Sequence, residues 1–467
     1  MLDKDLMRLA ARHATKFLDG LPNRPAGATG SRTDLHAALG GALPQAGTDP
    51  AAVIDMLANA VEPGLVASAG PRYFGFVCGG SLPTALAADW LTSAWDQNAG
   101  LYAGSPAASV VEEIVAQWLL DLLQLPATAS FGFVTGCQMA NFVGLASARH
   151  HVLEQTGWNV EESGLFGAPP INVLVGNDAH VTIFTTLNML GVGSGRVLRV
   201  PADDQGRMKI SELVKTLDTC KGPTIICAQA GNVNSGAFDP LEQIAALARR
   251  HQAWLHIDGA FGLWAAASPA LRHLVAGMEG ADSWAFDAHK WLNVPYDSGV
   301  AIVAHPESHR ATKAVRAAYL MRSGGPERDP FEWTPEASRR ARGFAIYAAL
   351  RSLGQRGVTE LVDRCCRLAV RMADRLKCEP GVEIINDVVL NQVLVRLHPS
   401  GGKDPDQYTW AVIARVQKEG TCWLGGTVWH GVTAMRISVS NWATSEDDAD
   451  RSVDAIVKAM REELAAS

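Results

Sequence analysis

The middle of the chain alternates short apolar runs with helical patterns. Between about Phe131 and Ala304, six apolar runs are bounded by polar or turn residues, namely 171–176, 196–200, 224–230, 254–258, 282–287 and 299–304. Helical patterns such as Leu241–His251 lie between them. This alternation predicts an α/β fold, with a mostly parallel sheet and helices on both faces. Sheets of this kind bind their ligand at the carboxyl ends of the strands.

The two ends of the chain have a different pattern. Residues before about 75 favour helices, interrupted by the Pro/Gly-rich segment Leu21–Gly30. From about Phe344 a helical pattern returns, followed by the apolar run 391–397, another helix and the run 435–440, which together indicate a smaller α+β domain. The predicted parts are an N-terminal helical segment, a large ligand-binding domain and a small C-terminal domain, at 1–75, 76–343 and 344–467.

Composition narrows the class of protein. The 467 residues are 48% hydrophobic and 19% charged, which is typical of a globular chain with more than one domain. Lys plus Arg number 41 and Asp plus Glu 48, giving a formal charge of −7. No basic patch dominates, which argues against nucleic acid or an anionic membrane as the main partner.

The sequence also favours a cytoplasmic protein. The first twenty residues carry charges every few positions, as an amphipathic helix does, and lack the apolar core of a signal peptide. The most apolar later stretch, Phe261–Met278, is interrupted by Pro269, Arg272 and His273 and is too short to span a bilayer. The eight cysteines are scattered without a C-x-x-C pair, so we expect reduced thiols and no metal site.

Lys290 and Asp258 are the strongest candidates for chemistry. Lys290 follows an apolar strand within Asp287-Ala288-His289-Lys290-Trp291, although a surface lysine can occupy such a position. Asp258 ends the run 254–258, and a carboxylate at a buried strand end needs a cation or hydrogen-bond donors. A protonated pyridine nitrogen would satisfy it, and the small Ala260 would let a flat ring lie there. A helix cap or a salt bridge remains an alternative.

Two weaker features fit the same picture. Gly136 permits a tight turn at the start of a helical run, where free N–H groups suit a phosphate, although a glycine before a helix is common. His180 follows a strand, and its flat imidazole can stack on a pyridine ring or approach a substrate carboxylate. A core or capping histidine is the alternative.

Together these features resemble the fold-type-I pyridoxal-5′-phosphate (PLP) enzymes, in the group II amino acid decarboxylase family of aromatic-L-amino-acid, tyrosine and glutamate decarboxylases. The resemblance extends from about residue 65 to 450. Its most specific segments are Trp254–Ala260 and His289–Leu292, whose Asp258 and Lys290 lie 32 residues apart. The other matching segments are Ser105-Pro106 with Glu112 or Glu113, 135–141, 178–180, 236–240 and 282–284.

The resemblance implies a role for each matching residue. Lys290 would be the Schiff-base lysine, Asp258 would pair with the ring nitrogen, and His180 would stack on the ring. Tyr319, 29 residues after Lys290 and beside a Gly/Pro-rich segment, would deliver the proton to Cα from a mobile loop. The remaining cofactor-binding residues would be the phosphate cup, the residue backing the ring and two neighbours, namely Gly136, Cys137, Gln138, His289, Ala260, Asp287 and Asn232.

The chain also departs from the family pattern. The usual Gly-Gly-Ser/Thr-Glu-Ala-Asn is Gly-Cys-Gln-Met-Ala-Asn at 136–141. The usual Gly-Thr-Thr is Gly-Asn-Val at 231–233, so Asn232 would have to replace a threonine hydroxyl. Among the expected substrate residues, Phe76, Gly100 and Tyr102, the last two differ from the aromatic-amino-acid enzymes. The substrate of the aromatic-amino-acid enzymes therefore cannot be assigned to this chain.

The resemblance implies an aspartate-aminotransferase-like homodimer that converts an L-amino acid, aromatic substrates included, into its amine and CO2. The N-terminal helices would pack on the partner subunit. An aldehyde-forming oxidative deaminase or an aminotransferase would keep the cofactor and change the reaction; Tyr319 argues against the aldehyde route. A carbon–carbon lyase remains open, and a non-catalytic PLP-binding protein is disfavoured by Lys290, Asp258 and His180.

Overall fold

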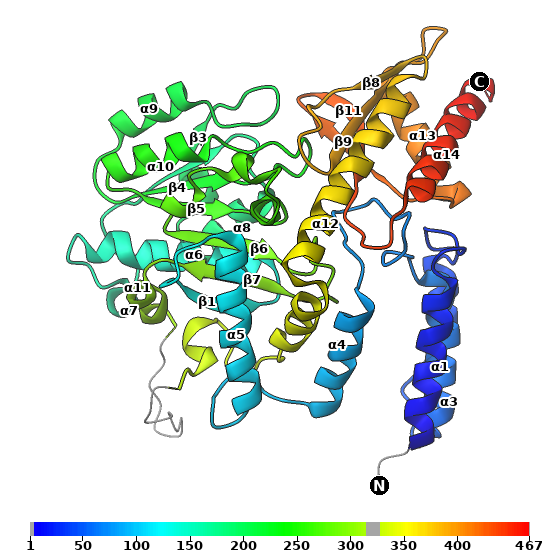
Figure 1. The fold of residues 1–467 in the computed structure, drawn as a ribbon, viewed down its shortest axis with the longest axis horizontal. Helices are drawn as coiled ribbons and strands as arrows, with labels where there is room; N and C mark the ends of the chain where they lie inside the picture. Colours follow the sequence, from blue (N-terminus) through cyan, green and yellow to red (C-terminus); the bar gives the residue numbers. More distant parts are fainter. Residues whose placement is uncertain (1–3, 314–326, 467) are drawn as a thin grey trace. The chain divides into compact units, whose positions relative to one another are not determined.

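The computed structural model describes residues 4–313 and 327–466 (Figure 1). The chain forms two compact units. The large unit comprises Gly79–Val370 and Asn386–Val393, and the small unit comprises Met1–Cys78, Arg371–Ile385 and Leu394–Ser467. The predicted division into three domains stays a prediction.

Helices occur throughout the described residues. In chain order, the α-helices up to the first half of the large unit are α1 (Lys4–Gly20), α2 (Arg32–Leu39), α3 (Pro50–Val61), α4 (Pro83–Trp95), α5 (Pro106–Leu123), α6 (Cys137–Glu154), α7 (Val160–Ser163) and α8 (Val181–Met189). The others are α9 (Ile210–Thr219), α10 (Leu241–Arg250), α11 (Pro306–Ala311), α12 (Gly343–Lys377), α13 (Pro405–Glu419) and α14 (Glu446–Ala465). Helix α12 is broken at Gly354, whose φ of 62° is left-handed.

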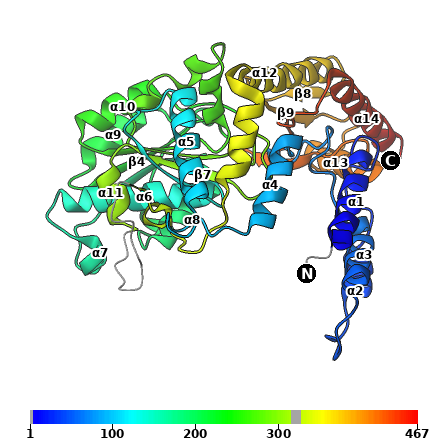
Figure 2. The ribbon, with the colours of Figure 1, turned by 60° about the horizontal axis from the view of Figure 1, so that its bottom comes forward.

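The large unit is built on a seven-stranded sheet with the order β1-β7-β6-β5-β4-β2-β3. Its strands are β1 (Ser130–Val134), β2 (Asn172–Gly176), β3 (Leu198–Val200), β4 (Thr224–Gln229), β5 (Trp254–Asp258), β6 (Ser283–Asp287) and β7 (Gly299–Val303). Strand β7 is antiparallel to both neighbours, and the other pairs are parallel, so six strands point the same way. Helices pack around this sheet in both views (Figures 1 and 2).

The central strands of the large sheet are apolar runs, as expected for strands covered on both faces. Strands β4, β5, β6 and β7 are buried along their whole length. Because six strands run in the same direction, the carboxyl ends of β1, β4, β5 and β6 meet at one edge of the sheet. Asp258 and Asp287 are the last residues of β5 and β6 and therefore lie at that edge.

The small unit contains the four-stranded sheet β10-β11-β9-β8. Its strands are β8 (Val382–Ile384), β9 (Gln392–Leu397), β10 (Gly425–Trp429) and β11 (Val432–Ser438). The β8–β9 and β10–β11 pairs are antiparallel, and α13 packs on both β11 and α14. Together with the larger sheet this confirms the predicted α/β fold class with a smaller C-terminal α+β part.

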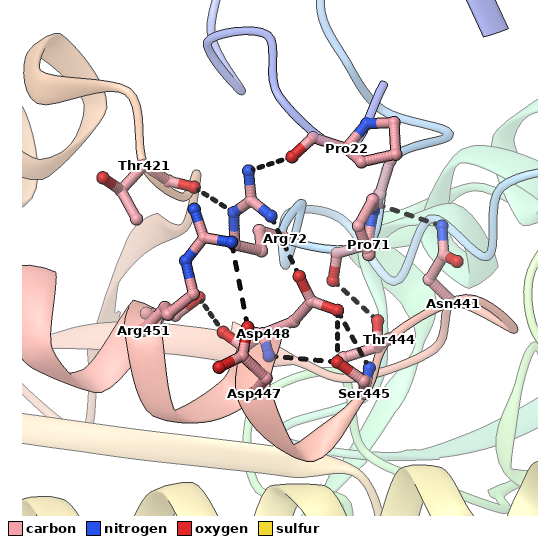
Figure 3. A network of polar contacts seen from close by, with 12 residues as sticks. Pro22, Pro71, Arg72, Thr421, Asn441, Thr444, Ser445, Asp447, Asp448 and Arg451 are labelled. Atoms are coloured by element: carbon pink, nitrogen blue, oxygen red, sulfur yellow. Dashed lines mark hydrogen bonds and ion pairs between the residues drawn. The ribbon is translucent and has the colours of Figure 1, made fainter. Parts of the chain in front are cut away.

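A buried ion pair holds segments of the small unit that are distant in sequence (Figure 3). The Arg72 guanidinium binds the Asp448 carboxylate at 2.9 Å and donates to the backbone oxygens of Pro22 and Thr421, both at 2.7 Å. Asp448 also forms a capping box with Ser445 at the start of α14. Each guanidinium nitrogen of Arg72 thus has an acceptor within this unit.

Within the described residues, none of the helices is long and apolar enough to cross a membrane.

Candidate active site

Lys290 lies three residues beyond β6, beside two buried carboxylates. Its Nζ is 2.9 Å from Oδ2 of Asp287. Burial lowers the pKa of Lys290, but the negative charge and hydrogen bond of Asp287 outweigh it, so the net pKa is raised above the ordinary lysine value. The amine is therefore held as an ammonium ion by a carboxylate of its own segment.

Asp258, at the end of β5, is held differently. Its Oδ1 accepts hydrogen bonds from Sγ of Cys137 at 3.3 Å and from the backbone N–H of Ala260 at 3.2 Å. Its Oδ2 accepts one from Nδ2 of Asn141 at 3.3 Å. Burial is the largest of the effects that raise the pKa of the Cys137 thiol far above its usual range, so the sulfur stays a protonated donor. Neutral groups supply these bonds, although a buried carboxylate usually has a cationic partner.

Helix α6 begins at the same edge. The N–H of Cys137, its first residue, donates to Oδ1 of Asp287 at 2.5 Å. His289 lies beside it, with its Nε2 3.4 Å from the same oxygen and its Nδ1 accepting from the backbone N–H of Ser298. Because Nδ1 is an acceptor, the ring proton is on Nε2. Burial lowers the pKa of His289, so the ring is neutral at pH 7.

Glycines make room at the start of α6. A Cβ on Gly136 would lie 3.1 Å from the His289 ring and 3.3 Å from the Asp287 carboxylate. A Cβ on Gly299, in β7, would come within 2.5 Å of the Gly136 backbone. The turn between β1 and α6 therefore passes close to β7 and leaves its amide end next to His289. A helix start of this kind favours an anion.

A family model described as a pyridoxal-dependent decarboxylase conserved domain matches residues 33–398. The chain belongs to this family. It is 29% identical over 433 residues to L-2,4-diaminobutyrate decarboxylase of Rhizobium meliloti (strain 1021), covering 90% of this chain and 84% of the relative. It is 26% identical over 390 residues to aromatic-L-amino-acid decarboxylase of Bacillus atrophaeus, covering 82% and 79%.

The fold of this decarboxylase agrees with solved structures. The crystal structure of Oryza sativa TDC with PLP and tryptamine has a TM-score of 0.92, at 22% identity and with 99% of both chains covered. The family, the fold class, the PLP cofactor and the PLP-dependent decarboxylation of an amino acid are thereby confirmed as predicted.

The residues at this edge of the decarboxylase fit PLP. Lys290 could form the covalent bond, Asp258 could bind the ring nitrogen, and the start of α6 with His289 could hold the phosphate. These groups are connected by the contacts Lys290–Asp287, Asp287–Cys137 and Cys137–Asp258. Ala260 is small and packs against the buried cluster that includes Cys137 and Ala285, which suits a flat ring. Asp287 adds a negative charge next to the helix start, and Lys290 balances it.

Three other predicted cofactor residues of the decarboxylase have hydrogen bonds or exposure of their own. His180 caps α8, with its Nδ1 2.8 Å from Oγ1 of Thr182. Gln138 is exposed on α6. Asn232 donates to the backbone oxygen of Asp178 at 3.0 Å, and its Oδ1 accepts from backbone N–H groups of its own turn. The cofactor contacts expected of these three side chains stay predictions.

The predicted substrate residues occupy both units. Gly100 is buried in the large unit, where a Cβ would come within 2.4 Å of the backbone oxygen of Ala337. The N–H of Tyr102 donates to Oδ1 of Asp329 at 2.8 Å. Phe76 belongs to the small unit. Tyr319 lies outside the described residues.

Sequence reasoning missed three site-supporting residues, Asn141, His256 and Ser283. Two periodicities point to His256 and Asn141. His256 lies two positions before Asp258 and therefore on the same face of β5. Asn141 lies four positions after Cys137 and on the same face of α6. Ser283 required the register of the sheet, which pairs it directly with His256.

Proposed function

We propose that decarboxylation takes place at the carboxyl edge of the large sheet, with Lys290 holding the cofactor and Asp258 pairing with its ring nitrogen. The observation that carries this is the contrast between the two carboxylates. Asp287 already has the Lys290 ammonium, whereas Asp258 accepts its hydrogen bonds from neutral donors and still suits a cation. PLP, when bound, supplies an electron sink for the electron pair left by departing CO2.

The neighbouring residues have separate tasks in this proposal. Asp287 lies 2.9 Å from Nζ of Lys290. It accepts the proton that the lysine must lose before its amine can form the bond to the cofactor. The turn at Gly136, the α6 start at Cys137 and Gln138, and His289 hold the phosphate. Ala260 supports one face of the ring.

His180 and Asn232 complete the proposed set. The hydrogen bond from Thr182 fixes the His180 imidazole, which supports a role in covering the ring and orienting the substrate carboxylate. A carboxylate held perpendicular to the ring places the breaking bond in line with the π system. Asn232 shapes the turn after β4 through its bonds to backbone groups.

The proposed substrate is an L-amino acid, with aromatic ones tested first. Phe76 is proposed as one substrate contact. The residue is 61% exposed, its φ is 54°, and its ring packs on the Trp423 ring with centroids 5.3 Å apart. An exposed aromatic ring can contact a flat side chain. Gly100 and Tyr102 are proposed as further substrate contacts.

Tyr319 is proposed as the proton donor to Cα. Loss of this proton donor would favour the aldehyde-forming alternative, so the residue also separates amine formation from that reaction.

We also propose a cytoplasmic homodimer. Helix α4 exposes Trp90, Leu91 and Trp95, and α1, α2 and α3 bury none of their described residues. Apolar side chains gathered on exposed helices mark an interaction surface, and an obligate dimer would bury about 2,000 Å² or more. The eight free cysteines support a reducing compartment.

The test is a screen of amino acids for CO2 release with added PLP, followed by borohydride reduction and peptide mapping. The expected result is a best substrate, with the cofactor trapped on Lys290 and no such adduct in Lys290→Ala. On that substrate, Tyr319→Phe should lower amine formation by about 10²–10⁴-fold and raise the aldehyde fraction. An adduct on another lysine would refute the Lys290 assignment, and an unchanged product partition would remove Tyr319.

A further inference from the structure

Behind Asp258 lies a continuous row of buried polar side chains. Nε1 of Trp254 is 2.9 Å from Oγ of Ser283, which is 2.8 Å from Nδ1 of His256. Nε2 of His256 is 2.9 Å from Oδ1 of Asn141, whose Nδ2 is 3.3 Å from Oδ2 of Asp258. All five side chains belong to the large unit, and each is at most 4% exposed. We call the first four residues the His256 relay.

The two ends of the relay fix its direction. An indole N–H only donates and a carboxylate only accepts. Asn141 must therefore turn its NH2 toward Asp258 and its oxygen toward His256, which places the imidazole proton on Nε2. Nδ1 is then an acceptor and takes the Ser283 hydroxyl proton, while the Ser283 oxygen accepts from Trp254. Each of the four hydrogen bonds in the row then has one donor and one acceptor.

The reversed direction is less favourable. If Asp258 were protonated and donated to Asn141, the amide would flip, and His256 would donate from Nδ1 to Ser283. The Ser283 oxygen would then face two donors, and its own proton would point to neither. Leaving a buried donor without its acceptor costs more than one hydrogen bond gains. The relay therefore favours the ionised form of Asp258.

Packing keeps His256 neutral and fixed in place. Burial is the main effect that lowers its pKa, to about 4. A Cβ on Gly144 would lie 2.8 Å from the imidazole, so this glycine lets α6 pass directly over the ring. Cys137, Asn141 and Gly144 follow the spacing i, i+4, i+7 and share the face of α6 that covers β5.

We propose that His256 is a positioning residue, which acts through Asn141 to keep Asp258 ionised and so to keep the proton on the ring nitrogen of bound PLP. This inference rests on the proposed pairing of Asp258 with that nitrogen. Hydrogen bonds to a carboxylate lower its proton affinity. Losing the relay would shift the shared proton from nitrogen toward the carboxylate and weaken the electron sink.

The experiment compares His256→Asn with His256→Gln in the PLP-loaded protein. A glutamine amide nitrogen reaches about as far as Nε2 of histidine and can still donate to Asn141, whereas asparagine reaches only toward Ser283. With ¹⁵N-labelled PLP, the ring nitrogen resonance should move toward that of neutral pyridine in His256→Asn and stay near wild type in His256→Gln. Decarboxylation should fall by about tenfold in the first variant and much less in the second.

Two controls separate this effect from damage to the fold. His309 is equally buried and bonds to Ser130 and to the backbone oxygen of Trp333, so His309→Asn should lower the melting temperature without moving the resonance. If His256→Asn does not retain PLP, Ser283→Ala breaks the relay on the other side of His256 and should move the resonance in the same direction.

Asp258→Asn separates the proposed pairing of Asp258 with the ring nitrogen from the proposed role of the His256 relay. If it leaves the resonance at the wild-type position, the pairing with the ring nitrogen is wrong. If it moves the resonance while His256→Asn and Ser283→Ala do not, the pairing stands and the relay is refuted. Equal shifts in His256→Asn and His256→Gln would also refute it, because only one of them loses the donor.

Discussion

Two buried carboxylates, Asp448 in the small unit and Asp258 in the large unit, are held in opposite ways. Asp448 binds the Arg72 guanidinium at 2.9 Å and accepts the backbone N–H of Ser445, the N-cap residue of α14 (Figure 3). Asp258 accepts hydrogen bonds from a thiol, a side-chain amide and a backbone N–H. One carboxylate has its counter-ion within the chain, whereas the hydrogen-bond donors of the other are neutral.

The difference separates a structural carboxylate from a functional one. A paired charge adds specificity to a fold but cannot bind another cation without losing its partner. A carboxylate oriented by neutral donors keeps its charge available. The ligand cation then completes the pair, and the site needs little reorganisation when it binds. Asp287 resembles Asp448 in this respect, because Lys290 already neutralises it.

The largest effect should follow removal of the charge at Asp258. Asp258→Asn keeps the shape and leaves the thiol and backbone donors in place, but a protonated ring nitrogen would then be buried without a counter-ion. Breaking such a pair costs about 3–5 kcal/mol, or roughly 10²–10⁴-fold in turnover. CO2 release measures it, with the melting temperature as a control for folding. Turnover near wild type would make Asp258 a second structural carboxylate like Asp448.

The matching change in the small unit should affect stability and leave the ring nitrogen unaltered. Arg72→Met leaves Asp448 buried without its cation, which should lower the free energy of unfolding by about 3–5 kcal/mol. Denaturant unfolding measures the loss. Arg72→Met combined with Asp448→Asn should recover part of it, because the asparagine oxygen can still accept the backbone N–H of Ser445. A double variant no more stable than Arg72→Met would show that the cost came from the lost backbone contacts at Pro22 and Thr421.

The sequence predicted most of the large sheet because its strands are buried on both faces. Such strands are continuous apolar runs, and the run 254–258 coincides with β5. The small unit was harder to predict: β8 has three residues and β10 begins with two glycines, so neither has a recognisable pattern. Short strands of this kind depend on their neighbours for stability.

From the sequence, Lys290 and Asp258 could be predicted to lie close together. Asn141, His256 and Ser283, which support Asp258, could not. Strand ends converge by a general rule, so the two residues could be placed at one edge from the sequence. The link from His256 to Asp258 depends on the pairing of His256 with Ser283 and on the close passage of α6 at Gly144. Neither is encoded in a local pattern, and both are determined by tertiary packing.

The smallest predicted effect is the pH dependence of stability that neutral His256 imposes. Its pKa is about 4 in the folded protein against 6.5 for the ordinary side chain. Between these values the unfolded chain binds the proton and the folded chain does not, so the free energy of unfolding falls as the pH decreases from 6.5 toward 4. From pH 7 to pH 5 this contribution should be about 2 kcal/mol.

His256→Gln removes this titration while keeping the donor to Asn141. Other buried groups also titrate: burial lowers the pKa of His309 in the same sense, and raises that of Asp239 to about 6 in the opposite sense. Because wild type and variant share these groups, the difference between their unfolding curves isolates His256. In urea unfolding, the free energy of unfolding should fall by about 2 kcal/mol less in the variant than in wild type when the pH is lowered from 7 to 5. Equal losses would mean that His256 takes up its proton alike in the folded and unfolded chain. The imidazole would then not be the fixed neutral link to Asp258, and the contrast with Asp448 would rest on Cys137, Asn141 and Ala260 alone.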